Sequence, residues 1–256
     1  MNEYGVIMDD WTWSYSRIKL YQQCPYAFIR KYIYHDRGIS NFYADYGSYI
    51  HHILQLHYSG KLSKDELQGY FISHFGDWIG RDVPSKIRAA YFSQGFDYFA
   101  GDILTPPAGS IIGVEREFEG TISGFKIRGF ADLVYQDHGL VICDHKSKQL
   151  MPRSLNGRRK KKDAELDDYQ RQLHLYAVLV RQELLAPVQH IEFNCFRNGN
   201  IIREECTMSK ELEAATWVAK SIEEIYRAES FQPCPDFFYC KNLCDLRGSC
   251  PYADCF

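Results

Sequence analysis

The sequence predicts an α/β fold in which a mixed central sheet is flanked by helices. Three patterns predict it: helical spacing of apolar residues up to about residue 105, strand-like runs from residue 111 onward, and a long amphipathic helix before a second pair of strands. With 256 residues, 45% of them hydrophobic, the chain can bury a full core. We expect one domain over residues 1–256.

Helices are expected to fill the N-terminal part, residues 1–105, and to form one wall of the domain. Residues 14–34 predict two short helices, because Pro25 must start a second helix or kink the first, and Ser14 is a candidate N-cap. Three further helices are expected at residues 47–58, 63–79 and 84–99. The segment 105–110, which contains two prolines and a glycine, ends this helical part.

The core of the domain is expected at residues 106–230. Strands are predicted at residues 111–118, 125–135 and 140–146, followed by a charged loop at 147–165 and a long helix at 166–185. A hairpin at 189–196 and 201–206 turns at Asn198-Gly199, and a last helix covers 209–228. Residues 231–256 form a cysteine-rich cap.

The hairpin GFADLVYQDHGLVICDHKS carries Asp132 on one strand and both Asp144 and Lys146 on the next. Asp144 and Lys146 share a face because they are two residues apart. A two-residue turn would place Asp132 opposite Cys143, whereas a three-residue turn ending at Gly139 places it opposite Asp144. Glycine adopts the left-handed conformation that the longer turn requires, so we predict the register that joins Asp132 and Asp144.

Two carboxylates beside an ammonium group suit a hard divalent cation and phosphodiester hydrolysis. The alternative is a solvated face with a surface salt bridge. Two neighbouring patterns favour the metal site: His51, one turn into a predicted helix, offers an imidazole ligand, and Gln172 and Tyr176 lie four residues apart on one helix face.

Four motifs in order resemble the PD-(D/E)XK nuclease superfamily, and specifically its RecB-like branch. They are Gly-x-x-x-His at 47–51, Gly-x-x-Asp at 129–132, Asp-x-Lys at 144–146 and Gln-x-x-x-Tyr at 172–176. The opening SYSRIKLYQQCPYAF is similar to the start of that branch, so the resemblance covers most of the chain. It implies a restriction-endonuclease-like fold.

The resemblance also implies roles for individual residues. A Mg²⁺ or Mn²⁺ ion would be held by His51, Asp132, Asp144 and the backbone carbonyl of His145. Lys146 would stabilise the attacking water or the pentavalent phosphate, and Gln172 and Tyr176 would position the DNA backbone. Glu115 occupies the place of an acid on the preceding strand, and we expect it to support the ligands from behind.

Nine cysteines in a chain without a readable secretory signal predict metal or cluster ligation rather than disulfides. In the tail, Cys240, Cys244 and Cys250 form a compact thiolate group that needs a fourth ligand, which Cys24 can supply. The resemblance implies a 4Fe-4S cluster held by one N-terminal and three C-terminal cysteines. Zinc suits four thiolates equally well.

The remaining cysteines fall into two groups. Cys234 or Cys255 could replace one member of the ligand set, because the gap between Cys240 and Cys244 is one residue longer than the branch usually has. Cys143, Cys195 and Cys206 lie within apolar strand patterns and are expected in the core.

The net charge of -3 supplies no global attraction for a polyanion, so DNA contacts must come from local basic patches. The loop after Lys146 is expected to bind phosphate, although a solvated charged loop is the alternative. Its basic residues are Arg153, Arg158, Arg159, Lys160, Lys161 and Lys162. A second basic patch is expected from Arg17, Lys19, Arg30 and Lys31.

These observations together predict a metal-dependent DNA exonuclease that acts on single-stranded or end-containing DNA in recombination, repair or phage replication. Two alternatives stay open: a non-catalytic nucleic-acid-binding or partner subunit that retains the fold, and a zinc-stapled interaction protein. The chain has no GxxxxGK[ST] motif, so any helicase or recombinase motor is expected on another polypeptide. No apolar run reaches the ~20 residues of a membrane span, and we expect a cytoplasmic protein.

Overall fold

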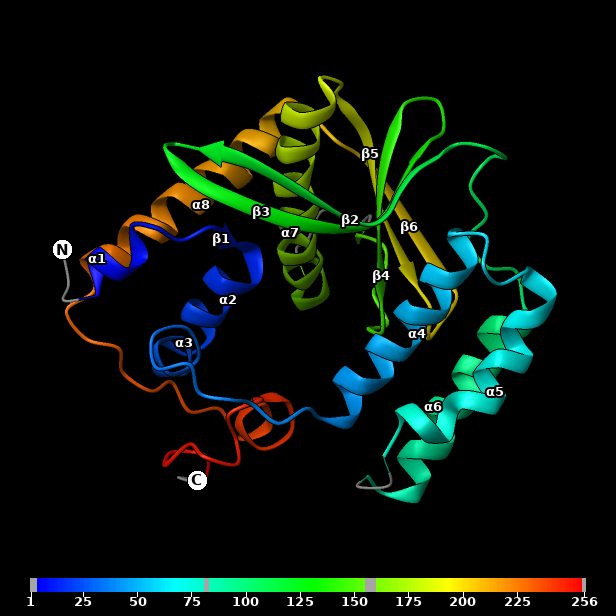
Figure 1. Ribbon diagram of the computed structural model, residues 1–256, viewed down its shortest axis with the longest axis horizontal. Helices are drawn as coiled ribbons and strands as arrows, with labels where there is room; N and C mark the ends of the chain where they lie inside the picture. The colour runs from blue at the N-terminus through cyan, green and yellow to red at the C-terminus, as the bar shows by residue number, and fades with distance from the viewer. Residues whose placement is uncertain (1–3, 81–82, 155–159, 255–256) are drawn as a thin grey trace. The chain divides into compact units, whose positions relative to one another are not determined.

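The computed structural model describes residues 4–80, 83–154 and 160–254 and divides into two compact units (Figure 1). Unit 1 comprises Met1–Asn41, Glu119–Gly129 and Leu212–Phe256, and unit 2 comprises Phe42–Phe118 and Phe130–Glu211. Each unit combines segments that are distant in sequence. The division therefore differs from the sequential parts 1–105, 106–230 and 231–256 expected from the sequence.

A mixed sheet forms the centre of unit 2, as the sequence predicts. The second half of β3 (Phe125–Gln136) pairs with β4 (Leu140–Lys146) in an antiparallel ladder, and β4 pairs in parallel with β5 (Val188–Cys195). Strand β6 (Asn200–Glu205) closes this order as the antiparallel partner of β5. The parallel step from β4 to β5 requires a crossover, which α7 (Lys161–Leu184) provides.

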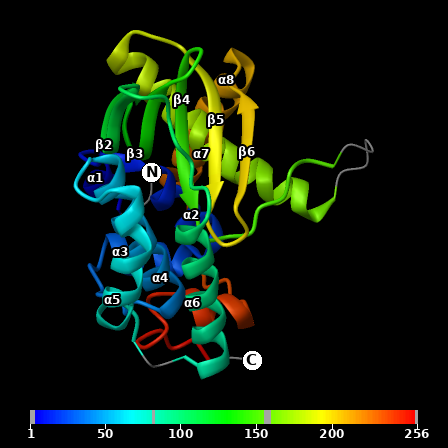
Figure 2. The same cartoon turned by 90° about the vertical axis from the view of Figure 1, so that its right-hand side faces the viewer.

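Helices cover both faces of this sheet (Figure 2). On one face, α4 (Phe42–Tyr58), α5 (Leu67–Trp78) and α6 (Ser85–Ala100) share a buried core with alternate residues of β4, including Val141 and Cys143. The opposite face receives α7, whose Tyr169 ring lies 6.4 Å from that of Phe193 on β5. A short 3-10 helix, Lys64–Glu66, leads into α5. The face toward α7 is the one that carries Asp144 and Lys146, because side chains alternate along a strand.

The turn between β3 and β4 has the predicted length of three residues. The ladder pairs Gln136 with Leu140 and continues to Leu133 and Cys143, so Asp132 and Asp144 stand at the next position. Gly139 adopts a φ of +126°, a conformation that favours glycine. The register predicted from the sequence is therefore confirmed.

Unit 1 contains the N-terminal helices and the cysteine-rich tail. Ser14 caps α2 (Tyr15–Gln23) by accepting the backbone N–H of Arg17 at 3.3 Å, and Pro25 occupies the first position of α3 (Pro25–Tyr32). The expected cap and the expected break at Pro25 are both confirmed. The other elements are α1 (Gly5–Met8), β1 (Trp13–Ser14), most of α8 (Met208–Arg227) and a single π-helical turn, Tyr239–Leu243.

Two long strands run through both units. Strand β2 (Ile111–Ile122) pairs with β3, and in unit 1 the first half of β3 pairs in parallel with β1. Helix α7 begins at Lys161, five residues earlier than the apolar pattern predicts. Asp163 explains the early start, because its carboxylate accepts the backbone N–H of Lys160 at 2.7 Å and that of Ser154 at 2.9 Å. Within the described residues, no helix combines the length and the apolar character needed to cross a membrane.

Candidate active site

The β3–β4 hairpin places three of the predicted site residues together in unit 2. Asp132 and Asp144 are only 9% and 6% exposed. The backbone N–H of His145 donates to Asp132 Oδ2 at 2.6 Å, which ties this carboxylate to the neighbouring strand. Lys146 Nζ lies 3.0 Å from Asp144 Oδ1 and 2.7 Å from Oδ2, so the expected pairing of acid and lysine on one face is present.

His51 reaches the hairpin from α4 and faces two carboxylates. Its Nδ1 lies 3.5 Å from Asp132 Oδ2 and 3.6 Å from Glu115 Oε1, and its Nε2 lies 2.8 Å from the carbonyl oxygen of His145. A carbonyl can only accept, so Nε2 carries the proton and Nδ1 presents its lone pair to the carboxylates when the ring is neutral. Histidines that ligate metals characteristically donate their other N–H to such an acceptor.

These three side chains form a group suited to a metal ion. One ligand atom each from His51, Glu115 and Asp132 lies within 4.8 Å of the others. Oxygen and imidazole donors in this number suit Mg²⁺ or Mn²⁺. Asp144 Oδ2 is buried and lies 2.7 Å from Lys146 Nζ, so the lysine balances the charge of this neighbouring carboxylate.

The electrostatics of the site show accumulated negative charge. Burial and the neighbouring Asp144 raise the pKa of Asp132 to about 7. Burial alone would lower the pKa of His51, but Asp132 and Glu115 outweigh it and raise this pKa to about 9. The pKa of Lys146 is likewise raised, because Asp144 outweighs the effect of burial. A divalent cation would relieve the repulsion among the carboxylates.

The arrangement differs from the expected ligand set in three respects. Glu115 was expected to stand behind the ligands, yet its carboxylate faces His51 directly. The carbonyl of His145, expected as a ligand, is instead engaged by His51, and Asp144 is paired with Lys146. His51 and Asp132 remain together as expected.

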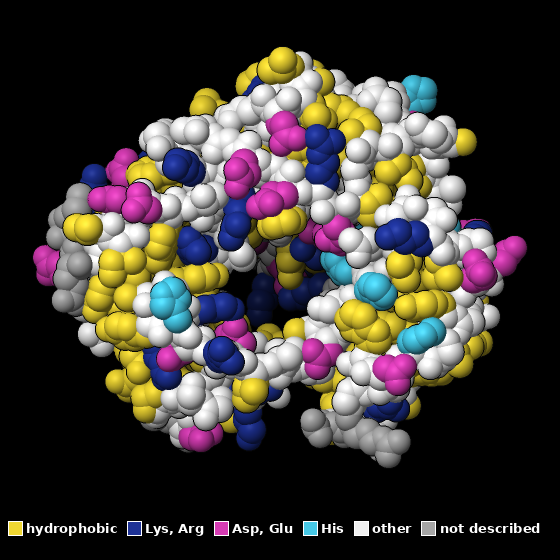
Figure 3. Space-filling view, in the orientation of Figure 1, with side chains coloured by type: hydrophobic (Ala, Val, Ile, Leu, Met, Phe, Trp, Pro, Cys, Tyr) yellow, Lys and Arg dark blue, Asp and Glu magenta, His cyan; other side chains and the backbone are white. Residues whose placement is uncertain are grey.

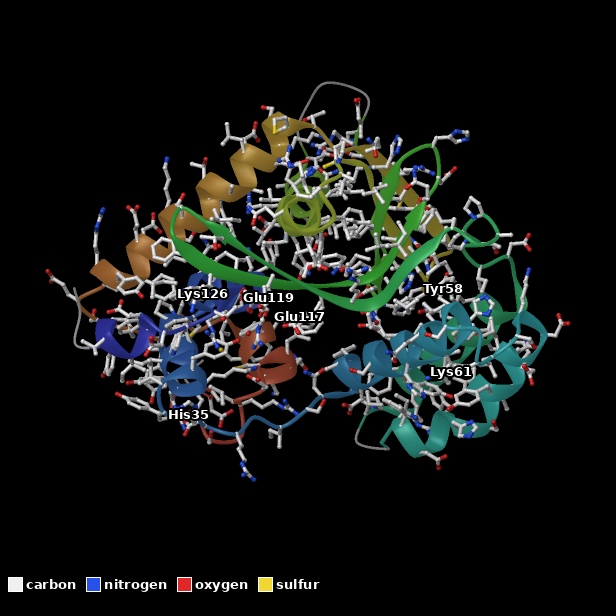
Figure 4. All side chains as sticks on the ribbon, turned by 45° about the horizontal axis from the view of Figure 1, so that its top comes forward. His35, Tyr58, Lys61, Glu117, Glu119 and Lys126 are labelled. Atoms are coloured by element: carbon white, nitrogen blue, oxygen red, sulfur yellow. The ribbon has the colours of Figure 1, made fainter. Side chains whose placement is uncertain are left out.

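Glu115 owes its position to an irregular backbone. It adopts a φ of +47°, a left-handed conformation that is unfavourable for residues other than glycine. Further along β2, Phe118 is buried, while its neighbours Glu117 and Glu119 are exposed (Figure 4). Burial alternates only from Glu117 to Glu119, whereas residues 113–116 are all half-buried, so an alternating pattern does not give the direction of Glu115.

Helix α7 brings aromatic and amide groups to the same face. Gln172 Nε2 donates to the hydroxyl of Tyr176 at 2.9 Å, so the two expected partners are joined. Burial and Asp144 raise the pKa of Tyr176 to about 12, although the hydrogen bond from Gln172 opposes this. The ring of Tyr169 lies 4.9 Å from Lys146 Nζ and holds the ammonium by a cation–π interaction.

On the opposite face, His145 is held by a buried network. Its ring stacks on Tyr58, at the end of α4, with centroids 5.6 Å apart (Figure 4). Asn194 Nδ2 lies 3.1 Å from His145 Nδ1 and also donates to the hydroxyl of Tyr98 at 2.7 Å. These contacts hold the strand whose backbone contacts both His51 and Asp132.

The predicted basic loop is only partly visible. Arg153 pairs with Asp167 at 2.6 Å and Gln170 at 2.9 Å, and Lys162 Nζ donates to the carbonyl of Pro152 at 3.2 Å. Lys160 and Lys161 lie at the start of α7. Arg158 and Arg159 fall outside the described residues.

Two of the four residues of the second basic patch pair with acids within unit 1. Arg30 and Lys31 pair with Asp36 and Asp245, respectively. The guanidinium of Arg17 lies over the Trp11 ring at 4.3 Å. Arg30 and Lys31 are thus paired with acids inside unit 1, and a role of this patch in binding DNA stays a prediction.

The cysteine-rich tail folds back on Cys24 within unit 1. One pocket is lined by all four predicted ligands and also by Cys234, whereas Cys255 lies outside the described residues. The lining cysteines are Cys24, Cys234, Cys240, Cys244 and Cys250. The backbone N–H of Cys234 donates to Cys24 Sγ at 3.5 Å, and that of Asp236 donates to Cys240 Sγ at 3.5 Å. These cysteines line one pocket, but none of them belongs to the group of possible metal ligands that lie within 4.8 Å of one another among the described residues.

The other three cysteines lie in the core as predicted. Cys143 and Cys195 are fully buried, and Cys206 is 9% exposed. Burial raises the pKa of Cys206 to about 12, and that of Cys195 to about 11. All three therefore remain protonated and serve as small packing groups.

Fold and site together define a mixed α/β protein with a partly buried site of histidine, carboxylates and lysine at a β hairpin, a donor set that suits a divalent metal ion. The profile of the PD-(D/E)XK nuclease superfamily matches residues 12–253, and the chain belongs to this superfamily. None of the curated proteins compared with the chain matches it.

One solved structure supports this fold. The crystal structure of a protein named "Putative exonuclease" from Eubacterium rectale has a TM-score of 0.51 and 14% identity, covering 88% of this chain and 84% of that one. A second structure, SSO0001, has a TM-score of 0.39 and 16% identity, covering 94% of this chain and 86% of the other. The first likeness confirms the restriction-endonuclease-like fold.

Proposed function

We propose that the protein is a Mg²⁺- or Mn²⁺-dependent DNA nuclease. The observation that carries the proposal is the convergence of His51, Glu115 and Asp132 within 4.8 Å, beside the ion pair of Asp144 and Lys146. A cation bound there would act as a Lewis acid on the phosphate and lower the pKa of a bound water. Membership of a nuclease superfamily supports the same reaction.

Each residue of the site would have a separate role in catalysis. His51, Glu115 and Asp132 would hold the cation, and Asp144, which is paired with Lys146, would join them as a further oxygen ligand. Because its pKa is raised, Lys146 stays protonated and acts as a cation that stabilises charge on the phosphate, rather than as a base.

Helix α7 would place the DNA backbone. The amide of Gln172 and the hydroxyl of Tyr176 form a hydrogen-bonded pair whose hydroxyl lies in the field of Asp144 and Lys146. Both groups can donate to a phosphate oxygen. Lys160, Lys161 and Lys162 would add longer-range attraction that weakens with salt.

We further propose exonucleolytic action on single-stranded or end-containing DNA in recombination, repair or phage replication, beside a helicase or recombinase on another chain. The order of the motifs supports a RecB-like enzyme. The name of the Eubacterium rectale protein supports an exonuclease.

The cysteine pocket of unit 1 would hold a 4Fe-4S cluster through Cys24, Cys240, Cys244 and Cys250. Cys234 is exposed, and its backbone N–H donates a hydrogen bond to Cys24 Sγ. This favours Cys234 as a residue that orients the ligand Cys24 rather than as a ligand itself. A cluster there would join the N-terminal helices to the tail and stabilise unit 1.

Cleavage of end-labelled DNA tests the nuclease. Wild type is expected to degrade DNA with Mg²⁺ or Mn²⁺, and Lys146→Ala to lose about 10²- to 10⁴-fold in rate. Lys148→Ala is the matched control, because Lys148 pairs with Glu165 and is half exposed. If the folded, metal-loaded wild type leaves every DNA intact, the protein is a binding or partner subunit instead.

Metal analysis tests the cysteine site. Protein purified without oxygen is expected to contain iron and sulfide and to absorb visible light, and Cys244→Ser is expected to remove both metal and colour. Cys234→Ser should retain them. Zinc without iron in the wild type would replace the cluster by a zinc site.

A further inference from the structure

A groove in unit 2 runs from the candidate metal site along α4. Its cavity volume is about 640 Å³, within the range of roughly 300–1,000 Å³ that small-molecule pockets span. His51 and Glu115 form the end shared with the metal site, and Trp78, from the end of α5, lines another part of the groove. A substrate whose phosphate reaches the metal site would place its adjoining nucleoside here.

Trp78 offers a supported aromatic surface in this groove. The indole is 38% exposed. The His52 ring stacks with the indole at a centroid distance of 5.0 Å and an interplanar angle of 26°, and the Tyr49 ring stacks with it at 5.4 Å and 29°. Tyr49 is fixed by a hydrogen bond from its hydroxyl to the carbonyl of Phe71 at 2.8 Å. The indole is therefore held in place before any ligand arrives.

The surroundings favour a base over a phosphate. Histidine and hydrophobic side chains lie side by side over α4 and α5 (Figure 3). The described lining contains no lysine or arginine, and its one acid is Glu115, which repels phosphate. Ala44, Gly47 and Ser48 line the helix side with small groups, so a ring can approach the backbone closely. His52 and Gln55 can hydrogen-bond to a base edge.

We infer that this groove binds an unpaired nucleobase next to the scissile phosphate, with the base stacked on Trp78. The inference rests on the proposed nuclease function and specifies its substrate as single-stranded DNA or an unpaired end. A base in a duplex is already stacked and paired, so it reaches Trp78 only after it is extruded from the helix.

Binding and cleavage measured on the same variants test the inference. Fluorescence anisotropy with Ca²⁺ compares a labelled oligothymidine with the same strand carrying abasic sites. Wild type is expected to bind the intact strand about 10- to 100-fold more tightly than the abasic strand. Trp78→Ala should abolish that difference, while Trp78→Phe should retain most of it and exclude misfolding as the cause.

Phe96→Ala is the matched control, because Phe96 is 37% exposed and lies on α6 outside the groove lining. Equal discrimination between intact and abasic strands in wild type and Trp78→Ala would overturn the inference. Cleavage separates the two proposals: DNA cut without dependence on Trp78 refutes only the groove, and base-dependent binding without cleavage refutes only the nuclease.

Discussion

Binding of Mg²⁺ at the active site is expected to release a proton from His51, because the proton and the metal ion would compete for the lone pair of Nδ1. The pKa of His51 is raised to about 9 by Asp132 and Glu115. At pH 7 the ring is therefore protonated, and the metal must displace that proton. The difference 9 − 7 corresponds to an affinity about 100-fold weaker than that of the neutral ring.

The sign of the effect follows from this competition. Affinity for Mg²⁺ should rise about tenfold for each pH unit between pH 7 and 9, because deprotonation of His51 removes the competitor. Below pH 7 the logarithm of the Mg²⁺ affinity should depend more steeply on pH, because Asp132, whose pKa is about 7, then binds a second competing proton. Isothermal titration calorimetry in buffers of different ionisation enthalpy counts the released protons, and about one per metal is expected at pH 8.

Two variants make the measurement specific. His51→Asn should make the Mg²⁺ affinity nearly independent of pH above pH 7. His138→Asn should leave it unchanged, because the side chain of His138 is 96% exposed at the β3–β4 turn, and asparagine tolerates its φ of +51°. An affinity that stays constant from pH 7 to 9, without proton release, would refute the placement of the metal at Nδ1.

Three further predictions concern stability. Gly95→Ala should destabilise unit 2 by about 1–3 kcal/mol in urea unfolding, because the new Cβ would lie 2.5 Å from the Phe71 ring. Gly76→Ala, which has open space around it, should stabilise the protein by about 0.5–1 kcal/mol. Equal effects of the two substitutions would contradict the close packing of Gly95 against Phe71. In EDTA, the Tm of wild type should fall as the pH rises from about 3.8 to about 7, because over this range Asp132 is ionised in the unfolded chain but keeps its proton in the folded protein, where its pKa is about 7. Asp132→Asn should lose less. Ser14→Ala should cost about 1 kcal/mol of unfolding free energy through the lost cap, and an unchanged urea midpoint would count against that cap.

Much of the fold could be predicted because it depends on short-range patterns. Residues within a few positions of one another determine three of its features: the strand from Leu140 to Lys146, the break before Pro25 and the β3–β4 turn. Helix α7 shows the limit of such patterns. Its first turn is rich in charge and was expected to be loop, and it forms because Asp163 caps it by hydrogen bonds.

The sequence by itself determined the position of each motif and the register that sets Asp132 beside Asp144, since turn length and side-chain alternation are local properties. Only the tertiary structure decided which groups meet His51. Glu115 lies 64 positions away in sequence (115 − 51), and its left-handed backbone breaks the alternation from which its direction would be inferred. The stacking of Trp78 on His52 likewise depends on how α5 packs against α4. Packing sets the contacts between distant segments, and the periodic pattern of residues in the sequence does not predict them.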